Sequence, residues 1–196
     1  MILSKEDYLN YVKCDARANW RSTCRARFFG DEPWKFILCM RKLEYWTMFS
    51  GIKKILFILP VMLNKLRFHR LSVLNGYSIP VGVCGKGLAL PHRGTIVINS
   101  GAKIGENCRI HQGVTIGSTS GSAKAARIGN NVFIGANASI IGDIDIADDV
   151  AIGANSVVMK SIKESKTTWG GIPARKISEN DSHSNLSPLL FEENAR

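Results

Sequence analysis

The second half of the chain carries aliphatic side chains at a regular spacing of six residues. They stand in one phase at Ile98, Ile104, Ile110, Ile116, Ile128, Ile134, Ile140, Ile146, Ile152 and Val158. A small or polar residue usually follows each of them, as at Gly105 and Gly117. This spacing fits neither the heptad of a coiled coil nor the strict alternation of a half-buried strand. It predicts short strands separated by tight corners and repeated along one axis.

Three consecutive hexads close one triangular coil, so the pattern also predicts a repeat of 18 residues. The aliphatic side chains then point into a prism and stack from coil to coil, Ile98 on Ile116 and Ile128 on Ile146. A single coil cannot bury its own apolar face, so the stack forms the core and its ends need caps. Small residues suit the corners, where a Cβ is disfavoured by the backbone conformation. We therefore expect a parallel β-helix over residues 76–177.

Two interruptions of the pattern mark candidate functional positions. The six-residue phase upstream of Ile98 is offset by two residues, and the slip falls across residues 91–95. Further on, residues 117–127 are polar and carry no aliphatic side chain at the expected position, Ser122. We interpret this second segment as a loop ejected from the prism. Loops held on a rigid scaffold often carry function.

The region before the prism, residues 1–75, has the signals of helices. We predict three of them, over about 5–20, 33–50 and 52–74. Ser4 opens a capping-box pattern before the first helix, and Pro33 follows two acidic residues at the start of the second. Pro60 lies inside the third and is expected to kink or divide it, because proline cannot donate a helical hydrogen bond.

The end of the chain lacks the repeat. Residues 160–177 are predicted to leave the prism as an irregular arm. Residues 178–196 form a polar, acidic tail that we expect to be disordered, because it has little apolar surface to bury. The predicted organisation is therefore a helical region, a β-helix domain and a tail.

The net charge of +10 is unevenly distributed. Residues 1–75 carry 14 basic and 6 acidic side chains, residues 76–177 carry 11 and 6, and residues 178–196 carry 1 and 4. A basic body favours an anionic partner, such as nucleic acid, a membrane surface or a phosphorylated cofactor. The sequence has no RNP-type aromatic motif, zinc finger or Gly-Lys-Ser/Thr phosphate loop, so we expect no nucleic-acid partner.

Targeting and metal-binding signals are absent from the sequence. No apolar stretch reaches the roughly 18 residues of a membrane span. The N-terminus has no apolar signal segment, so we expect a cytoplasmic protein. The five cysteines lack the short matched spacings of a disulfide framework or a zinc site. We expect reduced, mostly buried thiols and no bound metal.

One apolar segment is flanked by cations. Residues 55–63 are almost entirely hydrophobic, and the flanking basic residues are Lys53, Lys54, Lys65, Arg67 and Arg70. A basic amphipathic segment can lie in the interface of an anionic membrane. Residues 53–70 therefore suggest a peripheral contact with the inner face of the membrane. Packing against the prism or another protomer is the alternative.

Several stretches of the predicted prism resemble a known family. They are 88–92 (Leu-Ala-Leu-Pro-His), 94–98 (Gly-Thr-Ile-Val-Ile), 111–117 (His-Gln-Gly-Val-Thr-Ile-Gly) and 170–175 (Gly-Gly-Ile-Pro-Ala-Arg). These stretches are similar to the hexapeptide-repeat acyltransferases, specifically the serine-acetyltransferase-like branch. Residues 34–36 and 41–45 also resemble members found in bacterial polysaccharide clusters. The resemblance implies a mainly β protein with a left-handed parallel β-helix and an N-terminal α-helical region, a homotrimer, and acetyl-CoA as co-substrate.

By this resemblance, His92 stands at the family's catalytic histidine position. An acceptor hydroxyl must lose its proton as it attacks a thioester, and imidazole titrates near neutral pH. His111 stands at an outward corner about one coil later. Serine acetyltransferases generally have an apolar residue there. His111 either positions the acceptor beside His92 or is a solvated corner residue, and the sequence leaves both readings open.

The resemblance places the pantetheine arm of acetyl-CoA along stacked corners between two subunits. Ala136 and Ala154 match family positions along this arm, and Gly117 and Gly135 are further candidates beside it. The candidates for the phosphates are Lys124, Arg127, Lys160, Lys163, Arg175 and Lys176. Small residues permit close approach of a ligand to the backbone. Several phosphate charges need distributed cations.

The sequence departs from serine acetyltransferases where the amino acid should bind. Pro91 replaces the acid before the histidine, Tyr77 replaces a second acid, and Lys124-Ala125 replaces an Arg-His pair. Loss of these acids disfavours an acceptor with an ammonium group. We therefore expect O-acetylation of a sugar in a bacterial surface polysaccharide or its precursor. The alternative is a serine O-acetyltransferase of cysteine biosynthesis.

A metal-dependent β-helix enzyme is a further alternative. Proteins like the γ-carbonic anhydrases need three converging histidines for their metal. The prism of this chain contains only His92 and His111. We therefore favour acyl transfer over metal catalysis.

Overall fold

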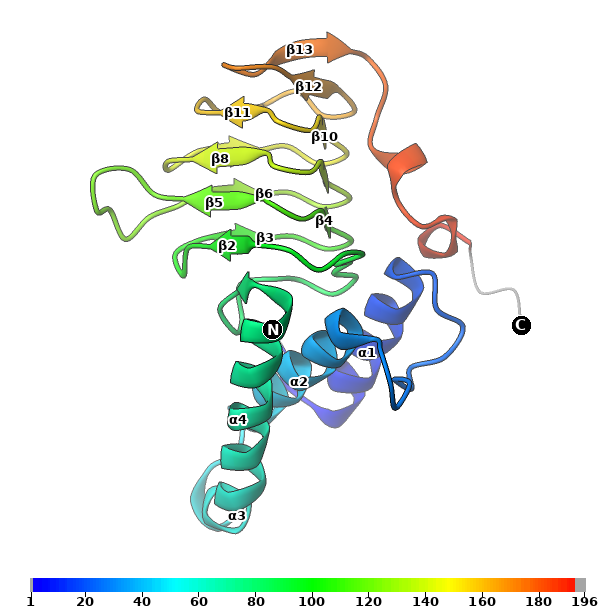
Figure 1. Cartoon of the computed structure of the whole chain (residues 1–196), viewed down its shortest axis with the longest axis vertical. Helices are drawn as coiled ribbons and strands as arrows, with labels where there is room; N and C mark the ends of the chain where they lie inside the picture. Colours follow the sequence, from blue (N-terminus) through cyan, green and yellow to red (C-terminus); the bar gives the residue numbers. More distant parts are fainter. Residues whose placement is uncertain (1, 193–196) are drawn as a thin grey trace.

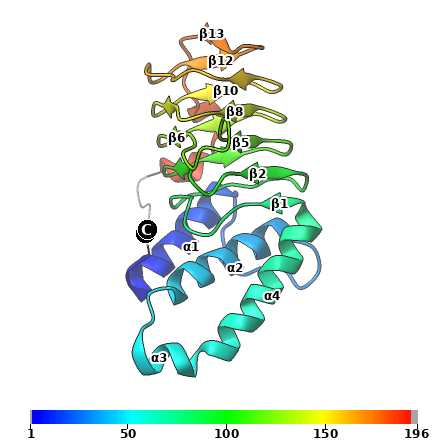
Figure 2. The ribbon, with the colours of Figure 1, turned by 90° about the vertical axis from the view of Figure 1, so that its left-hand side faces the viewer.

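The structure is a computed structural model that describes residues 2–192, with helices at one end and stacked strands at the other (Figure 1). The described residues form four α-helices, Lys5–Ala18 (α1), Glu32–Trp46 (α2), Gly51–Leu56 (α3) and Ile58–Asn75 (α4). Helices α1 and α2 lie against one end of the prism, and the tip formed by α3 points away from it (Figure 2). The helical region therefore caps the first coil.

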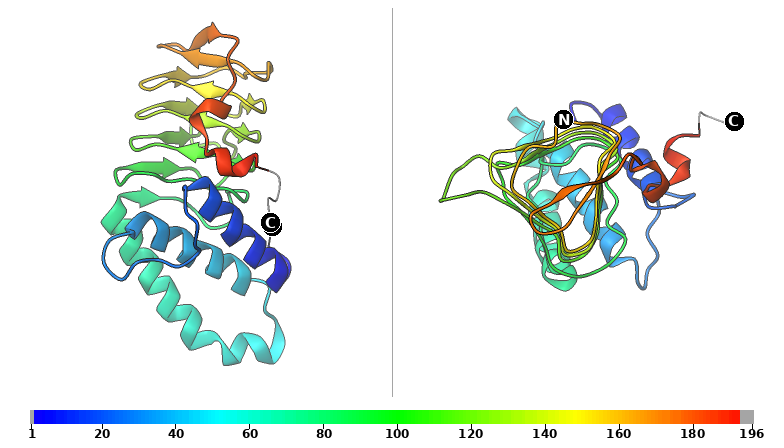
Figure 3. Two further views of the ribbon diagram at one scale, coloured as in Figure 1. Left: turned by 90° about the vertical axis from the view of Figure 1, so that its right-hand side faces the viewer. Right: turned by 90° about the horizontal axis from the view of Figure 1, so that it is seen from above.

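The strands form the three faces of a prism. Their bounds are Tyr77–Ser78 (β1), Ile96–Ile98 (β2), Lys103–Ile104 (β3), Arg109–Ile110 (β4), Thr115–Gly117 (β5), Arg127–Ile128 (β6), Phe133–Ile134 (β7), Ser139–Ile141 (β8), Asp145–Ile146 (β9), Ala151–Ile152 (β10), Val157–Val158 (β11), Thr168–Gly170 (β12) and Arg175–Ser178 (β13). The sheets have the orders β1-β2-β5-β8-β11, β13-β12-β10-β7-β4 and β3-β6-β9. Only β12 and β13 pair antiparallel among the described strands. The fold is a left-handed parallel β-helix, as expected (Figure 3).

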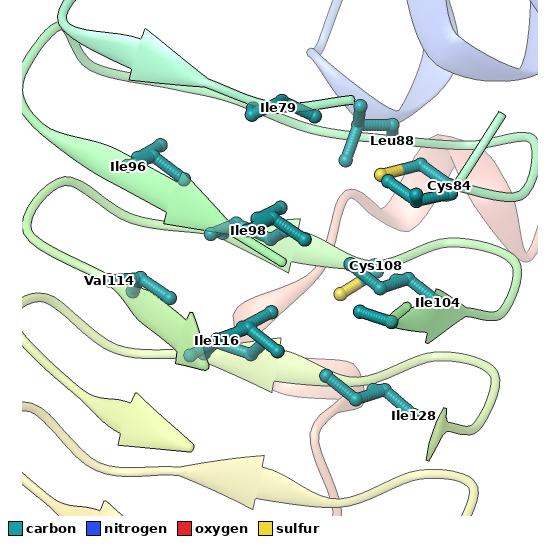
Figure 4. Close-up of a cluster of buried hydrophobic side chains, with 14 of the residues drawn as sticks. Ile79, Cys84, Leu88, Ile96, Ile98, Ile104, Cys108, Val114, Ile116 and Ile128 are labelled. Atoms are coloured by element: carbon teal, nitrogen blue, oxygen red, sulfur yellow. The ribbon is translucent and has the colours of Figure 1, made fainter. Parts of the chain in front are cut away.

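The predicted stacking of aliphatic side chains is confirmed. Ile98 pairs with Ile116, and Ile128 pairs with Ile146. Figure 4 shows Ile98, Ile116 and Ile128 inside the prism with the neighbouring core residues. Ile116 is fully buried, and Ile98 and Ile128 are nearly so. The period of six therefore reflects one inward side chain per strand.

The phase slip corresponds to a longer corner. Before it, the bridge partners in consecutive coils are Ala89 and Arg109. After it, the partners are Val97 and Thr115, and their separation in the sequence is two residues smaller than that of Ala89 and Arg109. The two additional positions of the earlier coil therefore belong to the corner between these pairs. This corner carries His92.

A second insertion separates β5 from β6. Strand partners across it, such as Lys103 and Arg127, are separated by four hexads instead of the three of a regular coil, so the insertion adds one hexad. Residues 118–126 form the loop that protrudes from the prism in Figure 1. Its last residues, Ala125 and Ala126, are buried, so the chain re-enters the prism wall just before β6.

The predicted helices are present, and the first two end earlier than expected. Ser4 caps α1 by accepting a hydrogen bond from the Asp7 backbone N–H at 2.9 Å, and Pro33 lies in the first turn of α2. The third predicted helix is two helices, α3 and α4. They meet at Phe57, within one turn of Pro60. The division has the expected cause, because Pro60 has no N–H for the helical ladder.

A buried arginine joins the helices to the prism. Arg41 of α2 and Asp15 of α1 are both completely buried and form an ion pair at 2.7 Å. Arg41 also donates to Glu44 at 2.9 Å and to the backbone carbonyl oxygens of Cys84 and Gly85. No pattern in the sequence indicates this cluster. It fixes both helices on the first coil.

The predictions for the C-terminal part need correction. The irregular arm expected over 160–177 is wrong, because β12 still pairs parallel with β10 and only β13 turns back. The tail expected to be disordered is ordered as far as residue 192, while residues 193–196 lie outside the described part. Leu186 is buried, and His183 contacts Asp149 at 2.8 Å. The tail runs back along the prism toward α1 (Figure 3), where apolar contacts offset its polar composition.

Candidate functional site

Two histidines lie at the same corner of the prism in consecutive coils. The pair Ala89–Arg109 sets the register, so the corner after Leu90 lies beside the corner after β4. The ring centroids of His92 and His111 are 5.5 Å apart. The ring of Phe133 in β7 continues the row, 5.2 Å from His111. The fold therefore brings together the two histidines singled out in the sequence.

Arg109 determines which ring nitrogen of His111 carries the proton in the neutral form. The Arg109 Nε–H donates to His111 Nε2 at 3.1 Å, so a neutral His111 carries its proton on Nδ1. Burial lowers the pKa of His111, and the charges of Arg109 and His92 lower it further. Arg109 itself lies 4.1 Å from the ring of Trp20. His111 is thus a half-buried, neutral side chain at neutral pH.

His92 is exposed on a corner that is held through its backbone. The Tyr77 hydroxyl donates to the His92 carbonyl oxygen at 2.6 Å. Tyr77 is 2% exposed and stands where an acid was expected from the resemblance. Within residues 2–192, no hydrogen bond reaches the His92 imidazole. Its nitrogens are therefore open to a substrate.

A pocket of about 470 Å³ opens beside His92. It lies between the loop 19–34 and the corner 89–93, so helices and prism both contribute. Asp31 and Glu32 line it, which corrects the expectation that the site lacks acids. Both are paired: Asp31 with Arg21 at 2.8 Å, and Glu32 with Arg93.

The ion pairs leave the carboxylates ionised. The hydrogen bond from Arg21 lowers the pKa of Asp31, although its partial burial acts in the opposite direction. The pKa of Glu32 is also lowered, first by its own backbone N–H and then by Arg93. The pocket therefore presents carboxylate–guanidinium pairs to a ligand.

The residues expected to contact the cofactor divide into two groups, and the first consists of small residues at the histidine corner. Ile110, Ile134 and Ile152 are in register, so Gly135, Ala136 and Ala154 lie at the histidine corner in later coils. Gly135 has a structural reason to be glycine, because a Cβ there would lie 2.6 Å from the backbone nitrogen of Ala154. Ala136 is half-buried and Ala154 is exposed.

The second group lies along a different edge. Gly117 ends β5 and pairs with Ile141, and Lys160 follows β11 in the same sheet. Lys124 lies in the protruding loop and Arg175 in β13. Within one chain, Gly117, Lys124 and Lys160 do not converge with the histidine corner. Arg175 instead pairs with Gly170 in the sheet β13-β12-β10-β7-β4, whose earlier strands lead to that corner.

Known proteins share this architecture. Residues 125–160 match the family described as bacterial transferase hexapeptide (six repeats). A serine acetyltransferase from Brucella abortus is 25% identical, with a TM-score of 0.65, covering 91% of this chain and 72% of its own. The Neisseria gonorrhoeae serine acetyltransferase in complex with serine is 27% identical, with a TM-score of 0.64, covering 90% and 71%. The Brucella abortus enzyme in complex with coenzyme A is 26% identical, with a TM-score of 0.62, covering 90% and 70%. No curated protein sequence matches this chain.

These neighbours extend over the helices as well as the prism. The chain is an acyltransferase whose repeats and fold are similar to those of the serine-acetyltransferase-like branch of the hexapeptide-repeat enzymes. The family match covers only the later coils, residues 125–160, whereas the solved structures cover most of the chain. The resemblance to the serine-acetyltransferase-like branch is thereby confirmed, whereas the resemblance to members of polysaccharide clusters stays a prediction.

Three of the cations considered for the acyltransferase's cofactor are already paired, and Lys124 contacts Asp143 at 3.9 Å. Arg127 contacts both Asp143 and Asp145. Lys176 contacts Glu164 and Glu179 at 2.5 and 2.6 Å. Neither is a free cation, because each is neutralised by two carboxylates. The expectation that Arg127 and Lys176 bind phosphates is not supported by these contacts.

Within residues 2–192 of the acyltransferase, no group of three or more His, Cys, Asp or Glu side chains is placed to bind a metal ion. The five cysteines are all free thiols. Burial raises the pKa of Cys84 to about 12, so this thiol stays protonated. A thiolate nucleophile or ligand at Cys84 is therefore disfavoured.

Sequence reasoning missed the helical side of the pocket. Asp31 and Glu32 were interpreted only as the start of a helix, and Trp20 only as the end of one. The departure that had been noticed, Pro91 in place of an acid, pointed to the correct corner. Asp31 and Glu32 belong to a segment far upstream of this corner, so the sequence around Pro91 does not indicate them.

Proposed function

We propose that this acyltransferase moves an acetyl group from acetyl-CoA to an acceptor hydroxyl, with His92 as general base. The observation that carries this proposal is an exposed imidazole that lines a 470 Å³ pocket and has no hydrogen bond to any residue of 2–192. The longer corner puts His92 there, and Tyr77 holds its backbone. Pockets of this size accommodate small-molecule substrates.

The proposed reaction is a direct transfer. The acceptor hydroxyl gives its proton to His92 as its oxygen forms a bond to the thioester carbonyl carbon. The carbon–sulfur bond then breaks, and the CoA sulfur leaves with the proton held by His92. No oxidant, metal or covalent enzyme intermediate is needed. Neutral His111, with its proton on Nδ1, lies beside His92 and can position the acceptor.

The residues present fit the acyl donor when two copies pack together. At the histidine corner, Ala136 and Ala154 leave room for a narrow chain such as pantetheine. Lys124, Lys160 and Arg175 are exposed cations for phosphates, but Lys124 and Lys160 lie at other edges and Arg175 lies in the last strand of the prism. A second copy can bring such cations to this corner. We therefore propose a homotrimer with the donor bound between protomers.

For the acceptor, we propose a sugar hydroxyl of a surface polysaccharide or its precursor. The Asp31 and Glu32 carboxylates are each occupied by an arginine, so neither is free to hold an ammonium group. Trp20 is 47% exposed and lines the pocket, where its indole offers an apolar face to a sugar ring.

Serine is the second candidate, and the comparisons support it better. The solved structures are serine acetyltransferases, and one of them contains serine. Asp31 and Glu32 also provide acids near His92 that the sequence analysis had missed. If an ammonium group displaces an arginine from either acid, the pocket can hold an amino acid.

A comparison of acceptors distinguishes the sugar proposal from the serine proposal. We would measure CoA release from acetyl-CoA with L-serine, simple glycosides and polysaccharide as acceptors, and compare kcat/KM. The sugar proposal predicts turnover on a glycan and a much lower kcat/KM for serine. Turnover on serine alone would make the chain a serine O-acetyltransferase and remove the sugar proposal.

We also propose peripheral membrane contact through the tip of α3 and α4. Ile52, Ile55, Leu56, Ile58 and Leu59 are between 61% and 76% exposed there. The sequence has no acid between Glu44 and Glu106, while five basic residues lie within 53–70. Among the described residues, no helix is long and apolar enough to cross a bilayer. Insertion of the tip into an anionic membrane surface explains both the exposed apolar side chains and the excess of basic residues.

Replacing Ile52 and Ile55 by serine is expected to weaken binding to vesicles with anionic lipid at least tenfold at low salt. The cause is loss of apolar area at the tip, and salt should weaken wild-type binding as well. The matched control is Leu3→Ser with Leu9→Ser, which alters exposed leucines outside the tip. If wild-type protein does not sediment with these vesicles, the membrane proposal fails. If the tip variant instead loses its oligomeric state, the tip is a protomer interface.

A further inference from the structure

A second groove continues from the pocket beside His92. It has a volume of about 450 Å³ and is formed by the loop 19–31 between α1 and α2. The pocket and the groove share Asn19, Trp20, Arg21 and Asp31 in their linings. A ligand that reaches His92 through the pocket can therefore extend into this groove.

The groove is strongly basic. Arg21, Arg25 and Arg27 line it, and Asp31 is the only acid in the lining. Arg21 is paired with Asp31, whereas Arg25 and Arg27 are exposed and make no ion pair within residues 2–192. In addition, the Nε of Arg21 is buried without a hydrogen-bond partner among the described residues. Guanidinium groups bind phosphate oxygens with paired hydrogen bonds.

The shape of the loop is held by its own hydrogen bonds. One carboxylate oxygen of Asp31 accepts from the Arg27 backbone N–H at 2.9 Å and from the Arg21 guanidinium at 2.8 Å. Arg21 also donates to the Arg25 carbonyl oxygen at 3.2 Å. The chain around Arg25 and Arg27 is therefore ordered before any ligand arrives. Such preorganisation reduces the entropy lost on binding.

We infer that this groove binds the phosphate or diphosphate of a glycosyl phosphate acceptor, whose sugar then lies in the pocket beside His92. The inference rests on the proposed sugar acceptor and narrows it to sugars that carry phosphate. The charge of the groove suits a dianion better than a neutral polysaccharide. Because the groove is continuous with the pocket, a single ligand can place its phosphate in the groove and its sugar beside His92. The source of the phosphate is either a nucleoside diphosphate sugar or a lipid-linked diphosphate sugar.

Direct binding tests the groove without relying on turnover. The probe is inorganic diphosphate, titrated by calorimetry into the full chain saturated with CoA, so that the phosphate sites of CoA are filled. Arg25→Gln with Arg27→Gln is expected to weaken diphosphate binding at least tenfold. Lys5→Gln with Lys13→Gln removes the same formal charge from exposed positions of α1 and should leave binding unchanged. His92→Ala should also retain binding, so loss of catalysis is distinguishable from loss of the groove.

Turnover then distinguishes the two sources. We would compare KM for one sugar offered free, as a nucleoside diphosphate sugar, and as a short-chain polyprenyl diphosphate sugar in detergent. One of the two phosphorylated forms is expected to have a KM at least tenfold below that of the free sugar, and the arginine double variant should remove this advantage. The groove is not a phosphate site if wild-type protein fails to bind diphosphate at about 10 mM. Equal weakening in the arginine and lysine double variants would refute it as well.

Discussion

His92→Ala is expected to lower kcat for acetyl transfer by about 10²–10⁴-fold, the usual contribution of a general base. The acceptor hydroxyl then has no group to take its proton as it attacks the thioester. The fold should persist, because the His92 side chain is exposed and makes no hydrogen bond within residues 2–192. Circular dichroism and thermal unfolding of the variant check this point. The measurement is CoA release at saturating acetyl-CoA.

A second histidine outside the pocket provides the control. His183 lies in the C-terminal segment and contacts Asp149, and it does not line the pocket. His183→Gln is therefore expected to affect stability more than kcat. If His92→Ala retains wild-type kcat while folding normally, the base must be another group. His111 would then be the next residue to test.

Arg41→Ala is expected to destabilise the protein by about 3–5 kcal/mol, as for other buried ion pairs that lose one partner. The substitution leaves the Asp15 carboxylate, completely buried, without its cation. It also leaves the Cys84 and Gly85 carbonyl oxygens without their donor. Burial alone would lower the pKa of Arg41, but Asp15 and Glu44 outweigh it and raise the pKa. Urea unfolding followed by circular dichroism measures the change.

Two variants of α2 make this measurement specific. Lys42→Ala removes a cation from the next position, where the exposed amine only lies over the Trp46 ring at 4.7 Å. Its expected change in the free energy of unfolding is below about 1 kcal/mol. Arg41→Lys keeps the charge but cannot reproduce the fork of donors, so an intermediate loss is expected. A loss for Arg41→Ala as small as that for Lys42→Ala would show that the cluster does not anchor the helices.

The prism could be predicted from the sequence because its packing repeats. Most strands send one side chain into the core, so residues such as Ile116 and Ile134 recur at a period that the chain itself displays. The two insertions were visible for the same reason, as breaks in that period. The corner of His92 was therefore located before any coordinate was known. Handedness and donor came from family resemblance, which the solved neighbours support.

The helical side of the site left no comparable signal. Asp31 and Arg21 meet the prism corner only through tertiary packing, so no spacing in the sequence relates them to His92. Arg41 falls within an otherwise apolar helix, and its partner Asp15 lies in another one. The order of the C-terminal segment was missed because composition does not show that Leu186 finds a buried position against the rest of the molecule. These features depend on contacts between distant parts of the chain.

Transfer of a labelled acetyl group tests the central claim most directly. The purified chain would be incubated with acetyl-CoA carrying a ¹³C-labelled acetyl group and with the glycan acceptors and serine, and both products followed by mass spectrometry and NMR. We predict labelled acetyl in ester linkage to an acceptor oxygen, with one free CoA formed for each ester and no label on the protein. Failure to form an ester on any hydroxyl acceptor, sugar or serine, would contradict assignment of this site to O-acetyl transfer.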